Sequence, residues 1–270
     1  MIKTTVGMIC LLTLGIFTSM VHAEAVPEDL PAISIIIDDL GSDNPRHERA
    51  VRLPGAIACS FLPRLPATHR LALLAHSYNK EIMLHLPMES VSHNPLGPGG
   101  LTLNMTQHEF VGTLQKDLES VPHVMGINNH MGSLLTRHPG HMVWLMKEMK
   151  RNGKLFFVDS RTTKESIAKT VADEQGVPGL QREVFLDHDP DKAAVRWQFE
   201  RTIEMARNHG TAVAIGHPYE STLEVLEEML PKLEQLHVRL VPVSEMIKLK
   251  QERNNTWQAS LSPLQKGVKN

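Results

Sequence analysis

Residues that could do acid–base or metal chemistry recur in one kind of place in this chain, the ends of short apolar runs. Carboxylates and imidazoles from separate strand ends can supply three ligands to a divalent ion and leave one position open for water. A further carboxylate can accept a proton from that water, and a histidine across the site can protonate a leaving group. Such a set predicts metal-assisted hydrolysis of an amide or ester. Six runs end in this way, at Asp38-Asp39, His85 (with Glu89 four residues on), Asn128-Asn129-His130 (then Gly132-Ser133), Asp159-Ser160-Arg161, Asp187-His188-Asp189 and Gly216-His217.

Each cluster also has a purely structural interpretation, and for some of them both remain open. Asp38-Asp39 fits an ordinary turn with side-chain-to-backbone bonding as well as it fits a site. His85 fits a hydrogen-bonded core histidine, whereas His130, flanked by asparagines and a Met-Gly pair, favours a functional role. Asp187-His188-Asp189 is equally a helix N-terminus, with Asp189 capping the helix that follows. We assign no chemistry to His22, His47, His69, His76, His108, His123, His138, His141, His209 and His237.

Parallel strands alternating with helices would bring these strand ends together. Amphipathic stretches predict helices over Thr106–Leu118 (opened by a capping box), His141–Arg151, Asp191–Asn208 and Thr222–Leu236, the last kinked at Pro231. The first strand is not followed by G-x-G-x-x-G, so we favour a barrel, closed or incomplete, over a Rossmann sheet. Its active site would lie at the C-terminal ends of the strands. The predicted strands are the apolar runs Ile33–Ile37, Ala56–Leu62, Glu81–Leu84, His123–Ile127, Leu155–Val158, Glu183–Leu186, Thr211–Ile215 and Arg239–Val243.

Composition narrows the class of protein further. The chain has 270 residues, a formal net charge of -2 and no basic stripe, which makes nucleic acid a poor candidate partner. Residues 1–23 resemble an export signal, with Lys3 before an uncharged stretch and Val21-His22-Ala23 at the cleavage positions. We therefore predict a cleaved signal and a periplasmic or secreted protein with no stable membrane span after cleavage; the alternative is that this segment stays as an uncleaved anchor. The predicted domain covers residues 24–250, followed by a polar, disordered tail at 251–270. Cys59, in an apolar run, is predicted to be a buried, inert thiol.

Several strings together resemble a known family. Ile36-Ile37-Asp38-Asp39-Leu40-Gly41 is similar to the Phe-Asp-Asp-Gly motif of NodB-type polysaccharide deacetylases, and Glu81-Ile82-Met83-Leu84-His85 is similar to their second motif. The stretch from Ala32 to Lys248 most resembles the divergent polysaccharide deacetylase branch. This resemblance implies an α/β fold, a distorted (β/α) barrel of about seven parallel strands. The strings that carry it are Asp-Asp-Leu-Gly, Leu-His-Leu-Pro-Met-Glu, Asn-Asn-His-Met-Gly-Ser and Gly-His-Pro.

The resemblance also implies roles for particular residues. Asp38 corresponds to the catalytic base, Asp39 to a metal ligand and His217 to the general acid. Glu89 stands where the family has a second metal histidine, so His130 is the candidate replacement from a neighbouring strand end. The family's arginine-proline motif has no clear counterpart. The predicted ligands of a divalent ion, with Zn²⁺ as the first candidate, are Asp39, His85, His130 and Glu89. The predicted catalytic residues are Asp38, His217 and, as an orienting group, Asp159. The predicted substrate-binding residues are Asn129, Ser133, Ser160 and Arg161.

The function implied is removal of acyl groups, acetyl first, from an amino-sugar polysaccharide or peptidoglycan-like glycan. Two other classes stay open. One is a catalytically silent carbohydrate-binding or envelope-assembly factor with the same fold, which the intact Asp38-Asp39 pair and three strand-end histidines argue against. The other is hydrolysis of a peptide amide or phosphoester. Phosphoryl chemistry usually needs more cationic groups than Arg161 alone at the strand ends.

Overall fold

A computed structural model describes residues 30–153 and 155–261, so the predicted signal at residues 1–23 lies outside the described part. In that part the strands form one parallel sheet in the order β6-β5-β4-β3-β2-β1-β8-β7, with β9 pairing beside β1. The strands are β1 (Ala32–Leu40), β2 (Ala58–Phe61), β3 (Glu81–Met88), β4 (Val124–Met131), β5 (Phe156–Asp159), β6 (Gly179–Gln181), β7 (Val184–Phe185), β8 (Thr211–Gly216) and β9 (Arg239–Leu240).

The sheet curls into a distorted barrel whose two edges meet through a short crossing segment. β6 and β7 are separated by Arg182 and Glu183 alone. The Arg182 N–H donates to Asp159 O (2.9 Å) at the β5 edge, and the Glu183 N–H donates to Val213 O (2.9 Å) at the β8 edge. The predicted fold class is thereby confirmed, although eight strands rather than about seven follow the sheet path.

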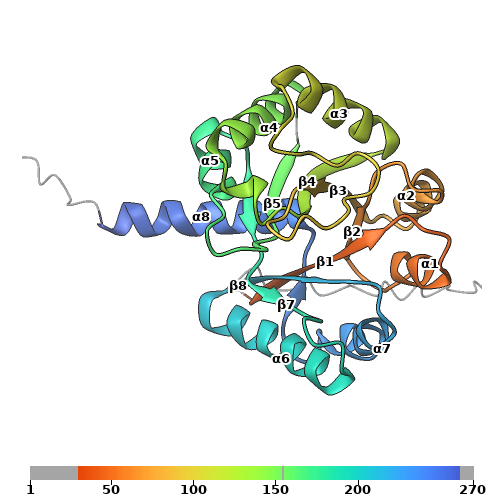
Figure 1. The fold of residues 1–270 in the computed structure, drawn as a ribbon. Coiled ribbons are helices and arrows are strands. Elements are labelled where there is room, and N and C mark those ends of the chain that lie inside the picture. Colours follow the sequence, from red (N-terminus) through yellow and green to blue (C-terminus); the bar gives the residue numbers. More distant parts are fainter. Residues whose placement is uncertain (1–29, 154, 262–270) are drawn as a thin grey trace, which may run out of the picture.

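Helices surround the barrel in Figure 1, and the C-terminal helix points away from it. Both faces of the strands are apolar, because helices cover the outside of the sheet and side chains of other strands fill its interior. Along β1 the side chains alternate, with Ile33, Ile35 and Ile37 packing towards the helices and Ile36 packing in the barrel interior. The helices are α1 (Pro45–Val51), α2 (Thr68–Ser77), α3 (Gln107–Ser120), α4 (Pro139–Arg151), α5 (Ala168–Gln175), α6 (Lys192–His209), α7 (Glu220–Met229) and α8 (Val243–Leu261).

Local signals set most helix boundaries as predicted. Thr106 caps α3, and Glu109 completes the capping box. α7 ends at Met229, and Pro231 lies in the 3-10 helix η2 (Leu230–Lys232), in agreement with the predicted break. One prediction was wrong: Asp191, not Asp189, caps α6, because its carboxylate accepts from the N–H groups of Ala193 (2.8 Å) and Ala194 (3.2 Å).

The predicted disordered tail is also corrected, because α8 continues through residue 250 to Leu261. The helix is held at its start by Glu81, whose carboxylate accepts from Val243 N (2.5 Å) and Ser244 N (3.2 Å). Lys250 then pairs with Glu183 (2.7 Å), and the Arg253 guanidinium lies over Gly210. The polar composition of residues 251–270 predicted disorder because composition alone does not reveal contacts of this kind with distant residues. Residues 262–270 fall outside the described chain.

Two further predictions concern burial and membrane segments. Cys59 is buried as expected, and burial raises the pKa of its thiol to about 12, which keeps it in the unreactive thiol form. Within residues 30–153 and 155–261, no helix has the length and apolar character needed to cross a bilayer.

Candidate metal centre

The carboxyl ends of β1, β3 and β4 carry the polar cluster, with β2 lying between β1 and β3 in the sheet. In the parallel register His85 of β3 pairs with Asn128 of β4, and Pro87 pairs with His130. Residues two apart on a strand point to the same face, so Asn128 and His130 share the barrel interior with His85. At the end of β1, Asp39 takes the left-handed conformation (φ 60°), which costs a non-glycine residue about 1–3 kcal/mol and is typical of functional sites. This turn directs the Asp39 carboxylate towards the two imidazoles.

Asp39, His85 and His130 form a group that could hold a metal ion, with one ligand atom from each within 4.8 Å of the others. The Asp39 Oδ1 atom lies 2.9 Å from His130 Nδ1 and 3.2 Å from His85 Nε2. The two ring nitrogens lie 3.2 Å apart. Ligand atoms bound about 2.0–2.1 Å from a tetrahedral Zn²⁺ lie about 3.3 Å from one another, so this triangle matches one face of such a site.

The hydrogen bonding of Asp39 supports the same fit. Its Oδ1 atom is buried, yet no described side chain donates a well-directed hydrogen bond to it, although two ring nitrogens are close. Burial alone would raise the pKa of Asp39, but the His130 and His85 rings hold it well below its ordinary value. The carboxylate therefore stays ionised, as a metal ligand must.

Asp38 lies beside this group and faces a different set of partners. Its carboxyl is buried, its Oδ1 accepts a hydrogen bond from Asn128 Nδ2 (2.8 Å), and its Oδ2 lies 3.6 Å from His85 Nε2. Burial raises the pKa of Asp38, against the attraction of His85 and His217. A raised pKa brings a carboxylate nearer to the range in which it can accept a proton.

His217 approaches the group from the end of β8, and its partner is Asp187. The Asp187 carboxylate contacts His217 Nδ1 (2.9 Å) and accepts from its backbone N–H (2.6 Å) and from Thr222 Oγ1 (2.7 Å). Burial disfavours the imidazolium, but Asp187 and the other carboxylates raise the pKa of His217 to about 9. His217 Nε2 points inwards, 3.8 Å from Asp39 Oδ2. This pair provides a protonated imidazole held in one orientation.

Asp187 rather than Asp159 is therefore the orienting carboxylate, which corrects the role predicted for Asp159. Asp159 is buried, but it accepts from Arg161 N (2.8 Å) and Ser166 Oγ (2.7 Å) and so secures the turn after β5. Both of these hydrogen bonds join Asp159 to residues close to it in the sequence, whereas the contact between Asp187 and His217 spans 30 residues.

Glu89 is not brought into the metal group. Its Oε2 accepts from Leu103 N (2.7 Å), and its Oε1 lies 3.3 Å from His93 Nδ1. Its backbone N–H donates to Leu101 O (2.9 Å). The segment between β3 and α3 folds back onto the end of β3, and Glu89 holds that segment instead of facing the imidazoles.

The residues predicted to bind substrate make contacts within the fold. Asn129 is buried, accepting from Ser160 N (2.9 Å) and donating to Met131 O (2.7 Å). The Ser160 hydroxyl accepts from Asn128 Nδ2 (3.3 Å), and the Ser133 hydroxyl accepts from Val91 N (3.1 Å). The Arg161 guanidinium reaches out to Gln181 (3.3 Å).

Arg182, a cation that the sequence analysis missed, lies in the segment between β6 and β7. Its guanidinium donates to Ser160 O (2.7 Å) and Arg161 O (2.9 Å) and stacks over Phe185, 4.7 Å from the ring centre. Burial lowers its pKa, while Asp159 and Asp38 act in the opposite direction. The sequence offers little to identify Arg182, which is simply a charged residue next to short strand segments.

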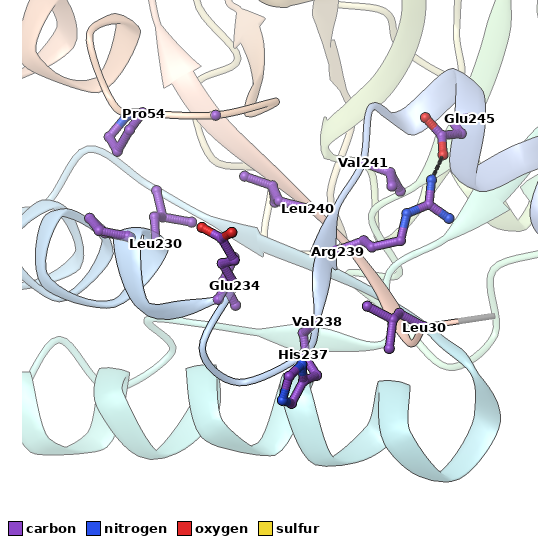
Figure 2. A pocket seen from close by; sticks show the side chains of 13 residues that line it. Leu30, Pro54, Leu230, Glu234, His237, Val238, Arg239, Leu240, Val241 and Glu245 are labelled. Atoms are coloured by element: carbon purple, nitrogen blue, oxygen red, sulfur yellow. Dashed lines mark hydrogen bonds and ion pairs between the residues drawn. The ribbon is translucent and has the colours of Figure 1, made fainter. Parts of the chain in front are cut away.

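A large cavity lies at the other end of the barrel. It measures about 1050 Å³ and is bounded by Leu30, by Gly55 and by β9, which pairs with the start of β1. Figure 2 shows its lining, mostly apolar, with His237 and the Arg239–Glu245 ion pair. The cluster of Asp39, His85 and His130 lies at the opposite strand ends, so this cavity is not part of the candidate metal centre.

Comparisons with known proteins show sequence similarity over most of this chain. Residues 35–247 match the sequence profile described as divergent polysaccharide deacetylase. The chain is 35% identical over 215 residues to the uncharacterized protein YibQ of Escherichia coli (strain K12), covering 80% of this chain and 67% of YibQ. It is 34% identical over 233 residues to an uncharacterized protein of Haemophilus influenzae, covering 86% of this chain and 81% of that one.

A solved structure supports the fold independently. The crystal structure of an uncharacterized protein from Agrobacterium tumefaciens C58 superposes with a TM-score of 0.76 at 20% identity, covering 80% of this chain and 89% of that one. An identity this low supports the fold alone, whereas the profile and the two relatives cover most of the sequence. On these grounds the chain belongs to the divergent polysaccharide deacetylase family.

Proposed function

We propose that this protein is an exported, metal-dependent hydrolase that removes acetyl groups from the amino sugars of a polysaccharide or peptidoglycan-like glycan. The observation that carries the proposal is the convergence of three groups at one barrel end. In the candidate ligand set of Asp39, His85 and His130, His85 Nε2 lies 3.6 Å from the buried Asp38 carboxylate, and Asp39 Oδ2 lies 3.8 Å from His217, which Asp187 holds. Family membership supports the same reaction.

The residues divide the reaction between them. A divalent ion bound by Asp39, His85 and His130 would polarise the amide carbonyl and acidify water. Asp38 Oδ2, the oxygen not bonded to Asn128, would take the proton as the water oxygen attacks the carbonyl carbon. His217 would give its Nε2 proton to the sugar nitrogen as the carbon–nitrogen bond breaks, releasing acetate and a free amine. Asp187 would hold the His217 ring and stabilise its charge.

Loss of one ligand should separate metal binding from the fold. We expect purified wild-type protein to bind close to one equivalent of Zn²⁺ and to release acetate from N-acetylglucosamine oligomers or peptidoglycan fragments. His130→Ala should weaken zinc binding by well over tenfold, because removing even an outer partner of a zinc ligand costs about 10–100-fold. Elemental analysis, zinc titration and acetate release are the measurements. His69→Ala, which changes an exposed histidine of α2, is the matched control and should bind zinc as the wild type does.

Two results would count against the proposal. Retention of full zinc affinity by His130→Ala would remove His130 from the ligand set. If the wild type releases no acetate with zinc, cobalt, nickel or manganese, the deacetylase proposal fails. The silent carbohydrate-binding or envelope-assembly factor would then be the better description.

Export is the second part of the proposal. It rests on the signal-like pattern of residues 1–23 in the sequence. Mass spectrometry of the protein from its native host should show Glu24 as the first residue, with the protein in the periplasmic or extracellular fraction. An intact Met1 would contradict cleavage, and a protein confined to the cytoplasm would contradict export.

A further inference from the structure

One buried amide connects five strands at the candidate site. Asn128, fully buried on β4, accepts at Oδ1 from Ser60 Oγ of β2 (2.6 Å) and contacts His85 Nδ1 of β3 (2.9 Å) with the same oxygen. Its Nδ2 donates to Asp38 Oδ1 of β1 (2.8 Å) and to Ser160 Oγ, which follows β5 (3.3 Å). A carboxamide has two acceptor sites and two donor hydrogens, so every hydrogen-bonding position of Asn128 is used.

This saturation fixes which nitrogen of His85 carries the proton. The partner of His85 Nδ1 is an oxygen that can only accept, so Nδ1 must be an N–H, and in the neutral ring Nε2 must then hold the lone pair. His85 Nε2 is the atom that faces Asp39 Oδ1 (3.2 Å) and His130 Nδ1 (3.2 Å). A metal ion needs the lone pair on that side of the ring.

The reversed orientation of the amide is disfavoured by the same neighbours. Exchanging its nitrogen and oxygen would place a carbonyl oxygen 2.8 Å from the Asp38 carboxylate. It would also turn the amide hydrogens towards His85 Nδ1, which would move the imidazole proton to Nε2. Asp38 therefore holds Asn128 in one orientation, and Asn128 in turn holds His85 in one tautomer.

The amide also selects which oxygen of Asp38 can act as the base. Oδ1 is occupied by the Asn128 N–H, whereas Oδ2 is directed towards the metal group, 3.6 Å from His85 Nε2. One side chain thus orients a metal ligand on one side and a proton acceptor on the other.

We propose that Asn128 is a positioning residue that fixes His85 in the Nδ1–H tautomer for metal binding and leaves Asp38 Oδ2 free for proton transfer. Its catalytic consequence rests on the proposed function. The tautomer itself is a property of the protein without metal or substrate.

The test is long-range ¹H–¹⁵N correlation NMR of histidine-labelled protein, with the His85 signals assigned by their loss in His85→Asn. The metal-free protein is measured at an alkaline pH where the ring is neutral, and zinc affinity is measured separately by titration. We expect Nδ1–H in the wild type. Asn128→Leu, which keeps the branched side-chain shape but lacks the amide, should shift His85 towards Nε2–H and weaken zinc binding by about 10–100-fold.

Ser60→Ala is the matched control, because it removes the other partner of Asn128 Oδ1 but keeps the bond to His85. It should leave the tautomer unchanged and zinc affinity within about threefold of the wild type, below the roughly 10–100-fold cost of losing a hydrogen-bond partner of a metal ligand. A wild-type ring with Nε2–H, or a folded Asn128→Leu variant that keeps Nδ1–H, would overturn the proposal. If Asn128→Leu does not fold, the wild-type tautomer decides. Absence of deacetylase activity would affect only the proposed function, because the tautomer is measured without substrate.

Discussion

Asp38→Asn is expected to lower the rate of acetate release by about 10²–10⁴-fold while zinc remains bound, which is the range for loss of a single proton-transfer group. The substitution keeps the shape of the side chain, and the amide oxygen of residue 38 can still accept the hydrogen bond from Asn128 Nδ2. It removes the ability to take a proton at Oδ2. The three proposed metal ligands are untouched, so the effect should fall on kcat with little change in zinc content.

A second carboxylate-to-amide change provides the control for this experiment. Asp43→Asn lies on the same connection between β1 and α1, but its side chain is exposed and pairs only loosely with Arg70 (3.7 Å). It should leave turnover unchanged. If Asp38→Asn holds zinc and works within about threefold of the wild type, the loss is far below that of a proton-transfer group and Asp38 is not the base.

Asp187→Asn is expected to move the alkaline limit of activity towards lower pH. His217 can act as an acid only while protonated, so activity falls as pH rises through its pKa, which Asp187 and its neighbours raise to about 9. Without the Asp187 charge this pKa falls towards its ordinary value near 6.5, so the alkaline limb moves down by about two pH units. At pH 8 the wild type would still hold most of its His217 protonated, whereas the variant would lose roughly ten- to thirtyfold in rate.

The measurement is the pH dependence of kcat for both proteins from pH 5 to 10. Thr222→Val controls for the hydrogen bonds that Asp187 makes elsewhere, because it removes a donor to Asp187 Oδ2 but keeps the charge beside His217. Its alkaline limb should stay near that of the wild type. An unchanged limb in Asp187→Asn would show that His217 is not the acid, or that another group holds its proton.

The sequence by itself determined the kind of fold and the end of the barrel at which the candidate site lies. All eight predicted apolar runs overlap observed strands, because strands covered on both faces must be apolar throughout. β6 was missed because Gly179-Leu180-Gln181 is too short and too polar to stand out. The strand-end rule also led to Asp38, Asp39, His85, His130 and His217, because parallel strands bring their carboxyl ends to one edge.

Only the tertiary structure decided what each of those side chains contacts. Glu89 follows β3 as closely as a ligand would, but the returning chain offers it the Leu103 N–H, and it turns away from the imidazoles. Asp159 and Asp187 look alike as strand-end aspartates, yet only Asp187 reaches His217. The full set of Asn128 bonds likewise joins residues as far apart as 90 positions. The pattern of apolar residues in the sequence indicates where each strand ends. Which side chains then meet is decided by the register between strands and by the path of the loops, and both depend on contacts between segments that are distant in the sequence.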